Sequence, residues 1–332
     1  MNDGHFQSAL WRTAGTPQGT IPLQTYKVPG LPNYDAYLGA IGSRIFFRGT
    51  STNFSDLELW TSDGTPQGTV RLKDISPGTN SSLPQHFTTI GSELYFFADD
   101  GPHGFELWQS DGTEAKTRMV SDINPDNSGS YASTPQDIFA FNGVIYYSTD
   151  DGSGFGLWRS DGTPQGTYKL ADVGATKFAS IGDHVVFISY DPIQGEEPWV
   201  TDGTTQGTRL LKDINPGAPN SMIGNYYFKS FGGALIFQAD DGQHGLELWR
   251  TDGTEAGTVL LQDIFPGPIG SLPFAYGEAG GAFYFQAADG VVGQEVWRLK
   301  DEIPPSLVDF KWTPAKTLRL QFNEDVPASI NI

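Results

Sequence analysis

The chain has 332 residues, of which 41 are Gly, 22 are Pro and none is Cys. This composition excludes long helices, disulfide bonds and cysteine-ligated zinc, and it favours short strands joined by tight turns. With 39 acidic and 20 basic residues, the formal net charge of −19 excludes nucleic acid and anionic membrane as partners. No apolar run approaches the roughly 20 residues that a membrane span needs, so no membrane insertion is expected.

Taken in order, the chain repeats a motif in which Trp precedes an Asp-Gly-Thr turn. Its full form is Glu-Leu-Trp-Thr-Ser-Asp-Gly-Thr at residues 58–65, with close copies at 106–113 and 247–254. The tryptophans of the motif are Trp11, Trp60, Trp108, Trp158, Trp199, Trp249 and Trp297. They are 49, 48, 50, 41, 50 and 48 residues apart, a period typical of propeller blades.

Each period predicts four short strands, which in the type unit cover residues 87–90, 94–98, 106–110 and 118–123. The second strand is apolar without alternation, which predicts that both of its faces are covered. We therefore expect residues 1–300 to form an all-β, six-bladed β-propeller of four-stranded antiparallel blades. Seven blades are the alternative.

The first and last copies of the motif are incomplete, so ring closure is open in the sequence. Closure could use the hairpin over residues 8–27 and displace 295–299, or it could place residues 20–27 beside 295–299. The Trp side chains are expected to pack between blades. The Asp and Gly of each turn are expected to be structural, with Gly at positive φ.

Three irregularities break the repeat. The interval from Trp158 to Trp199 is short by about eight residues, Lys116 replaces a repeat Gly, and Pro198 stands where Leu is usual. A distinct site would arise most easily in these neighbouring blades. Asp191 and Glu196 are acids without counterparts in the other repeats, and they are starting points for a catalytic site at a central channel.

The motif at residues 58–65, 106–113 and 247–254 resembles the bacterial ELWxxDGT repeat family, and the resemblance covers about residues 2–299. It implies a propeller-like segment of a large secreted or surface-attached protein, and therefore an extracellular or cell-surface location. It brings no catalytic residues. Residues 301–332 are expected to be a linker and the truncated start of a module that resembles a bacterial Ig-like domain, because Pro304-Pro305 precedes a strand-like Phe322-x-Glu324-x-Val326 pattern.

The candidate ligands for a metal are the paired acids that lead three loops. They are Asp99, Asp100, Asp150, Asp151, Asp240 and Asp241. Hard oxygen ligands beside Gly-rich loops suit Ca²⁺, while the competing interpretation is that these acids cap turns. Two further acidic series, Glu before the Trp and Asp at the end of the fourth strand, offer the same two interpretations.

Two functions follow from these patterns. The main hypothesis is a noncatalytic extracellular adhesion, binding or scaffolding module, stabilised by calcium and monomeric within a longer chain, with a glycan or a surface protein as partner. The alternative is a carbohydrate-active hydrolase or lyase whose site lies at the central channel and uses residues unique to single blades.

Overall fold

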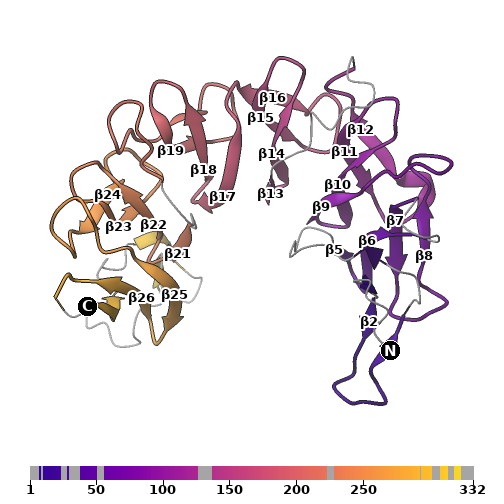
Figure 1. The fold of residues 1–332 in the computed structure, drawn as a ribbon, viewed down its shortest axis with the longest axis horizontal. Coiled ribbons are helices and arrows are strands. Elements are labelled where there is room, and N and C mark those ends of the chain that lie inside the picture. The colour runs from indigo at the N-terminus through magenta and orange to yellow at the C-terminus, as the bar shows by residue number, and fades with distance from the viewer. Residues whose placement is uncertain are drawn as a thin grey trace. The chain divides into compact units, whose positions relative to one another are not determined.

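The computed structural model (Figure 1) is an all-β chain. It describes residues 7–8, 10–23, 28–29, 38–50, 56–125, 137–222, 228–291, 293–300, 307–312 and 318–322. Within these ranges the only helix is a single 3-10 turn, η2 (Glu114–Lys116), and no helix there is long and apolar enough to cross a bilayer. The chain divides into two compact units, Met1–Phe178 with Gly203–Thr208, and Ala179–Asp202 with Arg209–Ile332.

The first unit contains three four-stranded antiparallel sheets in which strands adjacent in sequence pair. The first sheet consists of β5 (Leu38–Ile41), β6 (Arg44–Gly49), β7 (Glu58–Ser62) and β8 (Val70–Lys73). The second consists of β9 (Gln85–Ile90), β10 (Glu93–Asp99), β11 (Phe105–Ser110) and β12 (Arg118–Ser121). The third consists of β13 (Ile138–Phe141), β14 (Val144–Asp150), β15 (Phe155–Ser160) and β16 (Tyr168–Ala171). Two further pairs join β1 (Gln7–Ser8) to β4 (Val28–Pro29) and β2 (Trp11–Arg12) to β3 (Ile21–Pro22).

The second unit contains most of one four-stranded sheet, all of another, a three-stranded sheet and a hairpin. The first four-stranded sheet consists of β17 (Ala175–Ile181), which begins in the first unit, β18 (His184–Asp191), β19 (Gly195–Thr201) and β20 (Arg209–Leu210), and the next of β21 (Lys229–Phe231), β22 (Ala234–Asp240), β23 (Leu246–Thr251) and β24 (Val259–Gln262). The three-stranded sheet consists of β25 (Phe274–Ala279), β26 (Ala282–Ala288) and β27 (Gln294–Lys300). The hairpin consists of β28 (Leu307–Trp312) and β29 (Leu318–Phe322).

The predicted four-strand repeat is confirmed, because five sheets of the described chain have four antiparallel strands each. This architecture is compatible with a propeller-like fold. Six blades and a closed ring are not observed, because no sheet among the described residues joins the first strands of the chain to the last ones. The outer edge of β27 has no strand on it in the described sheets, whereas β24 pairs with the equivalent strand β23.

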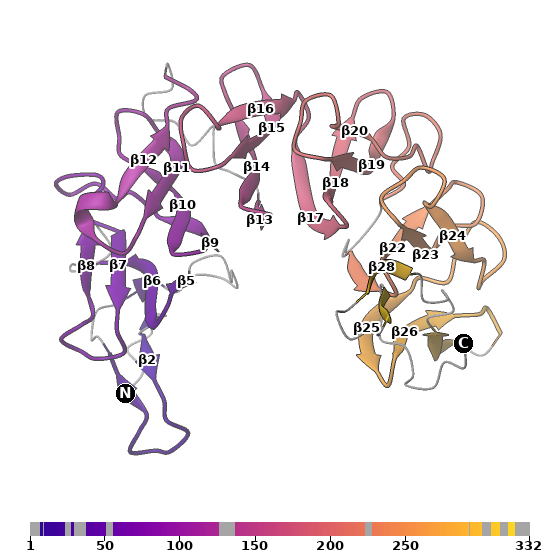
Figure 2. The ribbon, with the colours of Figure 1, turned by 180° about the vertical axis from the view of Figure 1, so that it is seen from behind.

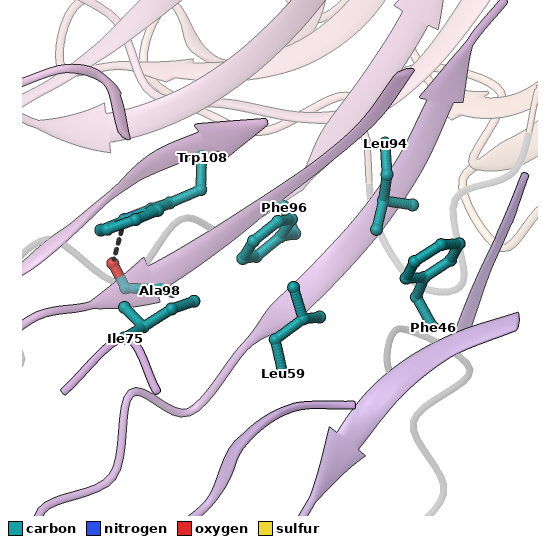
Figure 3. Packing of buried hydrophobic residues seen from close by; sticks show 7 residues of the cluster. All are labelled: Phe46, Leu59, Ile75, Leu94, Phe96, Ala98 and Trp108. Carbon is teal, nitrogen blue, oxygen red and sulfur yellow. Dashed lines mark hydrogen bonds between the residues drawn. The ribbon is translucent and has the colours of Figure 1, made fainter. Parts of the chain in front are cut away.

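The second strand of each sheet supplies the core, as its uninterrupted apolar sequence predicts. In β10, residues 94–98 are all buried, and in β18 residues 185–188 are all buried. Figure 3 shows how Leu94 and Phe96 of one sheet pack against Phe46 and Leu59 of the preceding sheet. Burying a large apolar side chain contributes about 1.5–3 kcal/mol, so each sheet depends on its neighbour for stability.

The repeat tryptophans occupy the predicted packing position in most repeats. Trp60, Trp108 and Trp249 are buried, and the Nε1 of Trp108 donates to the carbonyl of Ala98 at 3.1 Å (Figure 3). Trp11, in the incomplete first copy, is instead 57% exposed. Trp158, Trp199 and Trp297 are half-buried. The prediction is therefore confirmed for three tryptophans, holds in part for three and is wrong for Trp11.

The Asp-Gly-Thr turn has the structural role that its residues predict. Asp63 Oδ1 accepts from the backbone N of Thr65 at 2.9 Å and from its hydroxyl at 2.7 Å, while Gly64 has φ of 83°. A Cβ on Gly68 would lie 2.0 Å from the Asp63 carboxylate, which explains the repeat Gly five residues after the Asp. Where Lys116 replaces this Gly, the turn becomes the 3-10 turn η2 and the Lys116 ammonium pairs with Asp111 at 2.9 Å.

Candidate functional site

The acids predicted as calcium ligands lie in the loops between β10 and β11, between β14 and β15, and between β22 and β23. They are Asp99, Asp100, Asp150, Asp151, Asp240 and Asp241. The first acid of each pair caps its own loop, because Asp99, Asp150 and Asp240 each accept from the backbone N two residues on, at 2.7–2.8 Å. These three oxygens have the turn-capping role that was the competing interpretation.

The second acid of each pair contacts a cationic side chain. Asp100 meets His103 Nδ1 at 2.7 Å, Asp241 meets His244 Nδ1 at 2.7 Å, and Asp151 meets the Lys169 ammonium at 2.6 Å. The hydrogen bond to Asp100 raises the pKa of His103, and that to Asp241 raises the pKa of His244. In these contacts, each second acid has a basic side chain as its own partner.

The Glu that precedes the Trp fixes the connector to the next repeat. Glu58 is fully buried and accepts from the backbone N of Ile75 at 2.7 Å, from the N of Ser82 at 3.0 Å and from the Ser82 hydroxyl at 2.6 Å. Glu197 and Glu247 bind Ser221 and Ser271 in the same way. In all three, the Ser follows the Glu by 24 residues; the equivalent of Glu106 is Ser130, outside the described residues.

Burial disfavours the charged form of these glutamates. It raises the pKa of Glu106 to about 8 and that of Glu197 to about 7. A shifted carboxyl is often a sign of catalysis. Here both side chains have at most 1% exposure and bind the backbone of their own connector, so no substrate can reach them. The perturbed acids of this series are structural.

One further acidic group, Asp56, Glu58 and Asp74, has ligand atoms within 4.8 Å of one another. Arg71 Nη1 lies between them, 3.2 Å from Asp56 and 3.4 Å from Asp74. The guanidinium thus supplies the positive charge that this cluster needs.

The unmatched acids Asp191 and Glu196 occupy the hairpin between β18 and β19. Asp191 Oδ1 accepts from the backbone N of Ile193 at 2.8 Å and of Gln194 at 3.2 Å, which shapes the turn. The backbone of Glu196 binds Asn220 and Ser221 of the following connector. In these contacts both residues replace the usual Asp-Gly loop structurally.

The position that varies in chemistry from repeat to repeat lies at the start of the first strand. We call it the first-strand position: four residues before the last residue of β5, β9, β13, β17, β21 and β25. Its occupants are Tyr37, His86, Asp137, Lys177, Tyr227 and Ala275. Tyr37 and Tyr227 are outside the described residues, so only the sequence places them here. This position varies among aromatic, acidic, basic and small residues, and in three successive sheets its residue is ionisable.

Three of these residues are linked in the first unit. β9 lies beside both β5 and β13 (Figure 1, Figure 2). Asp137 accepts from the backbone N of Ile138 at 2.9 Å and from that of Lys177 at 3.1 Å, which connects β13 to β17. Burial lowers the pKa of His86, and the Asp137 carboxylate is near enough to oppose that shift.

The backbone and the aromatic neighbours also distinguish the first-strand position. His86 and Lys177 both have φ of 55°, a conformation that is uncommon for residues other than Gly and concentrates at functional sites. Beside them, Phe139 stacks on Phe178 at 6.0 Å with an angle of 12°. Our sequence analysis missed this site; aligning the first strands on their Gly-containing turns, such as Gly91 and Gly182, would have revealed it.

Neither a protein-family model nor a curated protein matches the chain. Among solved structures it is similar to a puromycin hydrolase, with 14% identity and a TM-score of 0.47 over 95% of this chain and 55% of that one. It is also similar to a puromycin-hydrolyzing peptidase of Mycobacterium tuberculosis, with 10% identity and a TM-score of 0.45 over 91% and 48%. It is also similar to a prolyl endopeptidase, with 12% identity and a TM-score of 0.43 over 97% of this chain and 47% of that one. The chain thus spans about half the length of these enzymes.

This comparison corrects the main functional hypothesis. The noncatalytic adhesion or scaffolding module is wrong, because these similar structures are hydrolases and peptidases. The alternative hypothesis, a carbohydrate-active hydrolase or lyase, is therefore the one taken up as a proposal below. A likeness at this level of identity and TM-score carries no information about substrate or mechanism, so both have to be derived from the residues of this chain.

Proposed function

We propose that this chain is a six-bladed propeller domain that cleaves carbohydrate at the first-strand position. The observation that carries this proposal is the succession of ionisable side chains, His86, Asp137 and Lys177, at one position of three successive sheets, with a positive φ at the first and the last. In a closed propeller the first strands line the central channel, where residues of single blades can converge on one ligand.

The closed ring follows from the two incomplete ends of the repeat. Residues 20–23 match the fourth strands of the complete sheets, whereas the sheet of β25, β26 and β27 has no fourth strand among the described residues. β26 and β27 pair over seven positions, but β2 and β3 pair over only two. We therefore infer that β27 keeps its place and that residues 20–23 move to its open edge.

The apolar surface at that edge supports this closure. A pocket of about 100 Å³ lies beside β27 and is lined by Leu248, Leu261 and Trp297, among others. In complete sheets the fourth strand buries an aliphatic residue such as Val120 or Leu211. Leu23 is the equivalent residue of the 20–23 segment. It is already buried in its present place, so closure would move it from one apolar environment to another.

The proposed activity is tested by screening neutral and acidic polysaccharides for newly released reducing ends. We expect at least one glycan to be cleaved and His86→Asn to abolish the cleavage, since Asn tolerates the left-handed backbone of residue 86. Glu196→Ala serves as the comparison and should retain activity, because the contacts of Glu196 named above are made by its backbone. If no glycan is cleaved, or if Glu196→Ala alone abolishes cleavage, the proposal fails.

Calcium at the acidic loops stays a second proposal. Four acids at the ends of fourth strands each have a buried Oδ1 without a hydrogen-bond partner; they are Asp74, Asp122, Asp213 and Asp263. The negative charges of Asp100 and Asp122 both contribute to the raised pKa of Glu106. Members of two acidic series therefore lie near each other in that repeat. Binding of calcium to the folded state would raise the melting temperature. We expect EGTA to lower the midpoint of a calcium-loaded sample; an unchanged midpoint removes calcium from the account.

The cellular setting also belongs to this proposal. We propose that the chain is part of a larger secreted or surface-attached protein of the ELWxxDGT repeat type, and that residues after 300 lead into an Ig-like module. The supports are the repeat motif itself, the net charge of −19, and the separate hairpin that β28 forms with β29. An extracellular location places the site where polymeric glycans occur.

A further inference from the structure

We propose that the first-strand position is the proton-transfer site of a lyase, which cleaves uronate-containing glycans by β-elimination with His86 as base and Lys177 as partner for the substrate carboxylate. This inference rests on the proposed function, and it names the substrate class and the type of reaction. It is argued from the residue types at the position, the geometry that joins them, and the chemistry that each reaction requires.

The residue types at the position argue against glycoside hydrolysis. That reaction generally uses a pair of carboxyl groups on the two sides of the scissile bond, one as acid and one as base or nucleophile. The six occupants of the position include a single carboxylate, Asp137. Both of its oxygens already accept backbone N–H groups, from Ile138 and Lys177. Asp137 is therefore a positioning residue that joins two strands.

β-Elimination requires a different set, which the position supplies. It needs a base to remove the proton on the carbon beside the uronate carboxylate, and a cation to stabilise the negative charge that develops on that carboxylate. His86 is partly buried, and burial lowers its pKa, which favours the neutral imidazole that a base requires. Lys177 is exposed and supplies a local positive charge, which the site needs because the net charge of −19 repels a polyuronate.

The local structure places these residues on the first strands of three successive sheets. The Asp137 carboxylate accepts a hydrogen bond from the backbone N of Lys177 at 3.1 Å. The negative charge of the same carboxylate opposes the lowering of the His86 pKa by burial. The aromatic layer of Phe139, Phe141 and Phe178 extends through β13 and β17, with ring separations of 6.5 and 6.0 Å. These half-buried rings provide an apolar surface against which the C–H face of a sugar ring can pack.

The reaction balances without a cofactor. His86 takes the proton from the carbon that bears the carboxylate, and the electrons of that C–H bond form a double bond to the neighbouring ring carbon. The bond from that carbon to the glycosidic oxygen breaks, and its electron pair leaves with the oxygen, which takes a proton from solvent. The imidazolium then returns its proton to solvent. One chain end becomes an unsaturated uronate, and the other a new reducing end.

The test compares two readouts on polygalacturonate, alginate and glucuronan: the ultraviolet absorbance of unsaturated uronate, and the number of reducing ends. We expect both to rise together with the wild-type chain. His86→Asn should lower the rate by about 100-fold or more, which is the range for loss of a general base. Lys177→Asn should lower the rate on polyuronates by roughly 100-fold. Both replacements use Asn because it tolerates positive φ.

Matched controls separate the site from general effects. His184→Asn changes an exposed histidine at the start of β18, and Lys73→Asn changes a lysine on a fourth strand; both should retain wild-type rates. The melting temperature of each variant shows whether it is folded. Reducing ends without absorbance would mean hydrolysis, so the lyase inference would fail while the proposed function stands. Absence of both products on every glycan would overturn both, and a fully active, folded His86→Asn variant would overturn the role of His86.

Discussion

Replacing Glu247 by Ala is expected to destabilise the chain by about 3 kcal/mol or more. The Glu247 side chain is fully buried and accepts from the backbone N of Phe265 at 3.0 Å, from the N of Ser271 at 2.9 Å and from the Ser271 hydroxyl at 2.5 Å. Alanine leaves these donors buried without an acceptor, and each such group costs about 1–3 kcal/mol. Urea unfolding followed by Trp fluorescence measures the loss.

Glu295→Ala is the matched control for this prediction. Glu295 has the same place before the Trp of its repeat, but it is exposed on β27. Its replacement should change the free energy of unfolding by no more than about 0.5 kcal/mol. Equal effects of the two substitutions would show that the hydrogen bonds between Glu247 and its connector contribute nothing to stability.

The stability of the chain should fall as the pH is raised from about 4.5 to about 8. Burial raises the pKa of Glu106 to about 8 and that of Glu197 to about 7, from an ordinary value of 4.5. A carboxyl with a raised pKa in the folded state contributes stability that is complete below its unfolded pKa and is lost as the pH passes its folded pKa. Since one pKa unit corresponds to about 1.4 kcal/mol, Glu106 alone contributes on the order of 5 kcal/mol at most.

The other shifted groups in this pH window mostly act in the same direction. The raised pKa values of Glu58, His103 and His244 likewise remove stability as the pH rises. The lowered pKa of His86 acts in the opposite direction. Urea midpoints at pH 5, 6.5 and 8 measure the slope, and Glu106→Gln should flatten it. A midpoint that rises with pH in the wild-type chain would contradict the buried, protonated state of Glu106.

The repeat could be predicted in detail because each of its features follows from local chemistry. The uninterrupted apolar run of residues 94–98 indicates a strand covered on both faces, and Asp63 with Gly64 indicates a turn with positive φ. Both are confirmed. The role of the Glu series could not be derived from local pattern alone, because the partners of Glu58 lie 17 and 24 residues further along the chain.

The structure accounts for the irregularity of the third four-stranded sheet, β13–β16, which is followed by the short interval from Trp158 to Trp199. It has Gly156 where the other repeats have Glu, and its connector is the short one. A Cβ on Gly156 would lie 2.8 Å from the Lys169 side chain, which occupies this space and pairs with Asp151 and Asp172. The repeat that lacks the buried Glu is therefore also the one with the short connector, so no long connector is present for a Glu to hold.

No motif marks the first-strand position, and only an alignment of the first strands on the Gly of the following turn, as at Gly91 and Gly182, brings its residues together. His86, Asp137 and Lys177 are related only through the register of three strands, which is known once the strand ends at Ile90, Phe141 and Ile181 are fixed. The acids that the sequence does mark, such as Asp100 and Asp241, pair within their own loops. Residues that build a repeat leave a periodic signal, whereas residues that distinguish one repeat from another do not.

The closed ring is tested most directly by a disulfide between residues 21 and 298. The chain has no Cys, so Ile21→Cys with Arg298→Cys introduces the only pair. In the preceding sheet, Arg250 directly follows Trp249 and pairs with Val259 of the fourth strand. Arg298 follows Trp297 in the same way, and Ile21 is the counterpart of Val259. Residues 21 and 298 should therefore face each other in a closed ring. Arg250→Cys with Val259→Cys is the positive control, and Arg12→Cys with Ile21→Cys reports the pairing of β2 with β3. We predict a 21–298 cross-link within the monomer; its absence where the 250–259 pair forms would contradict closure of the propeller.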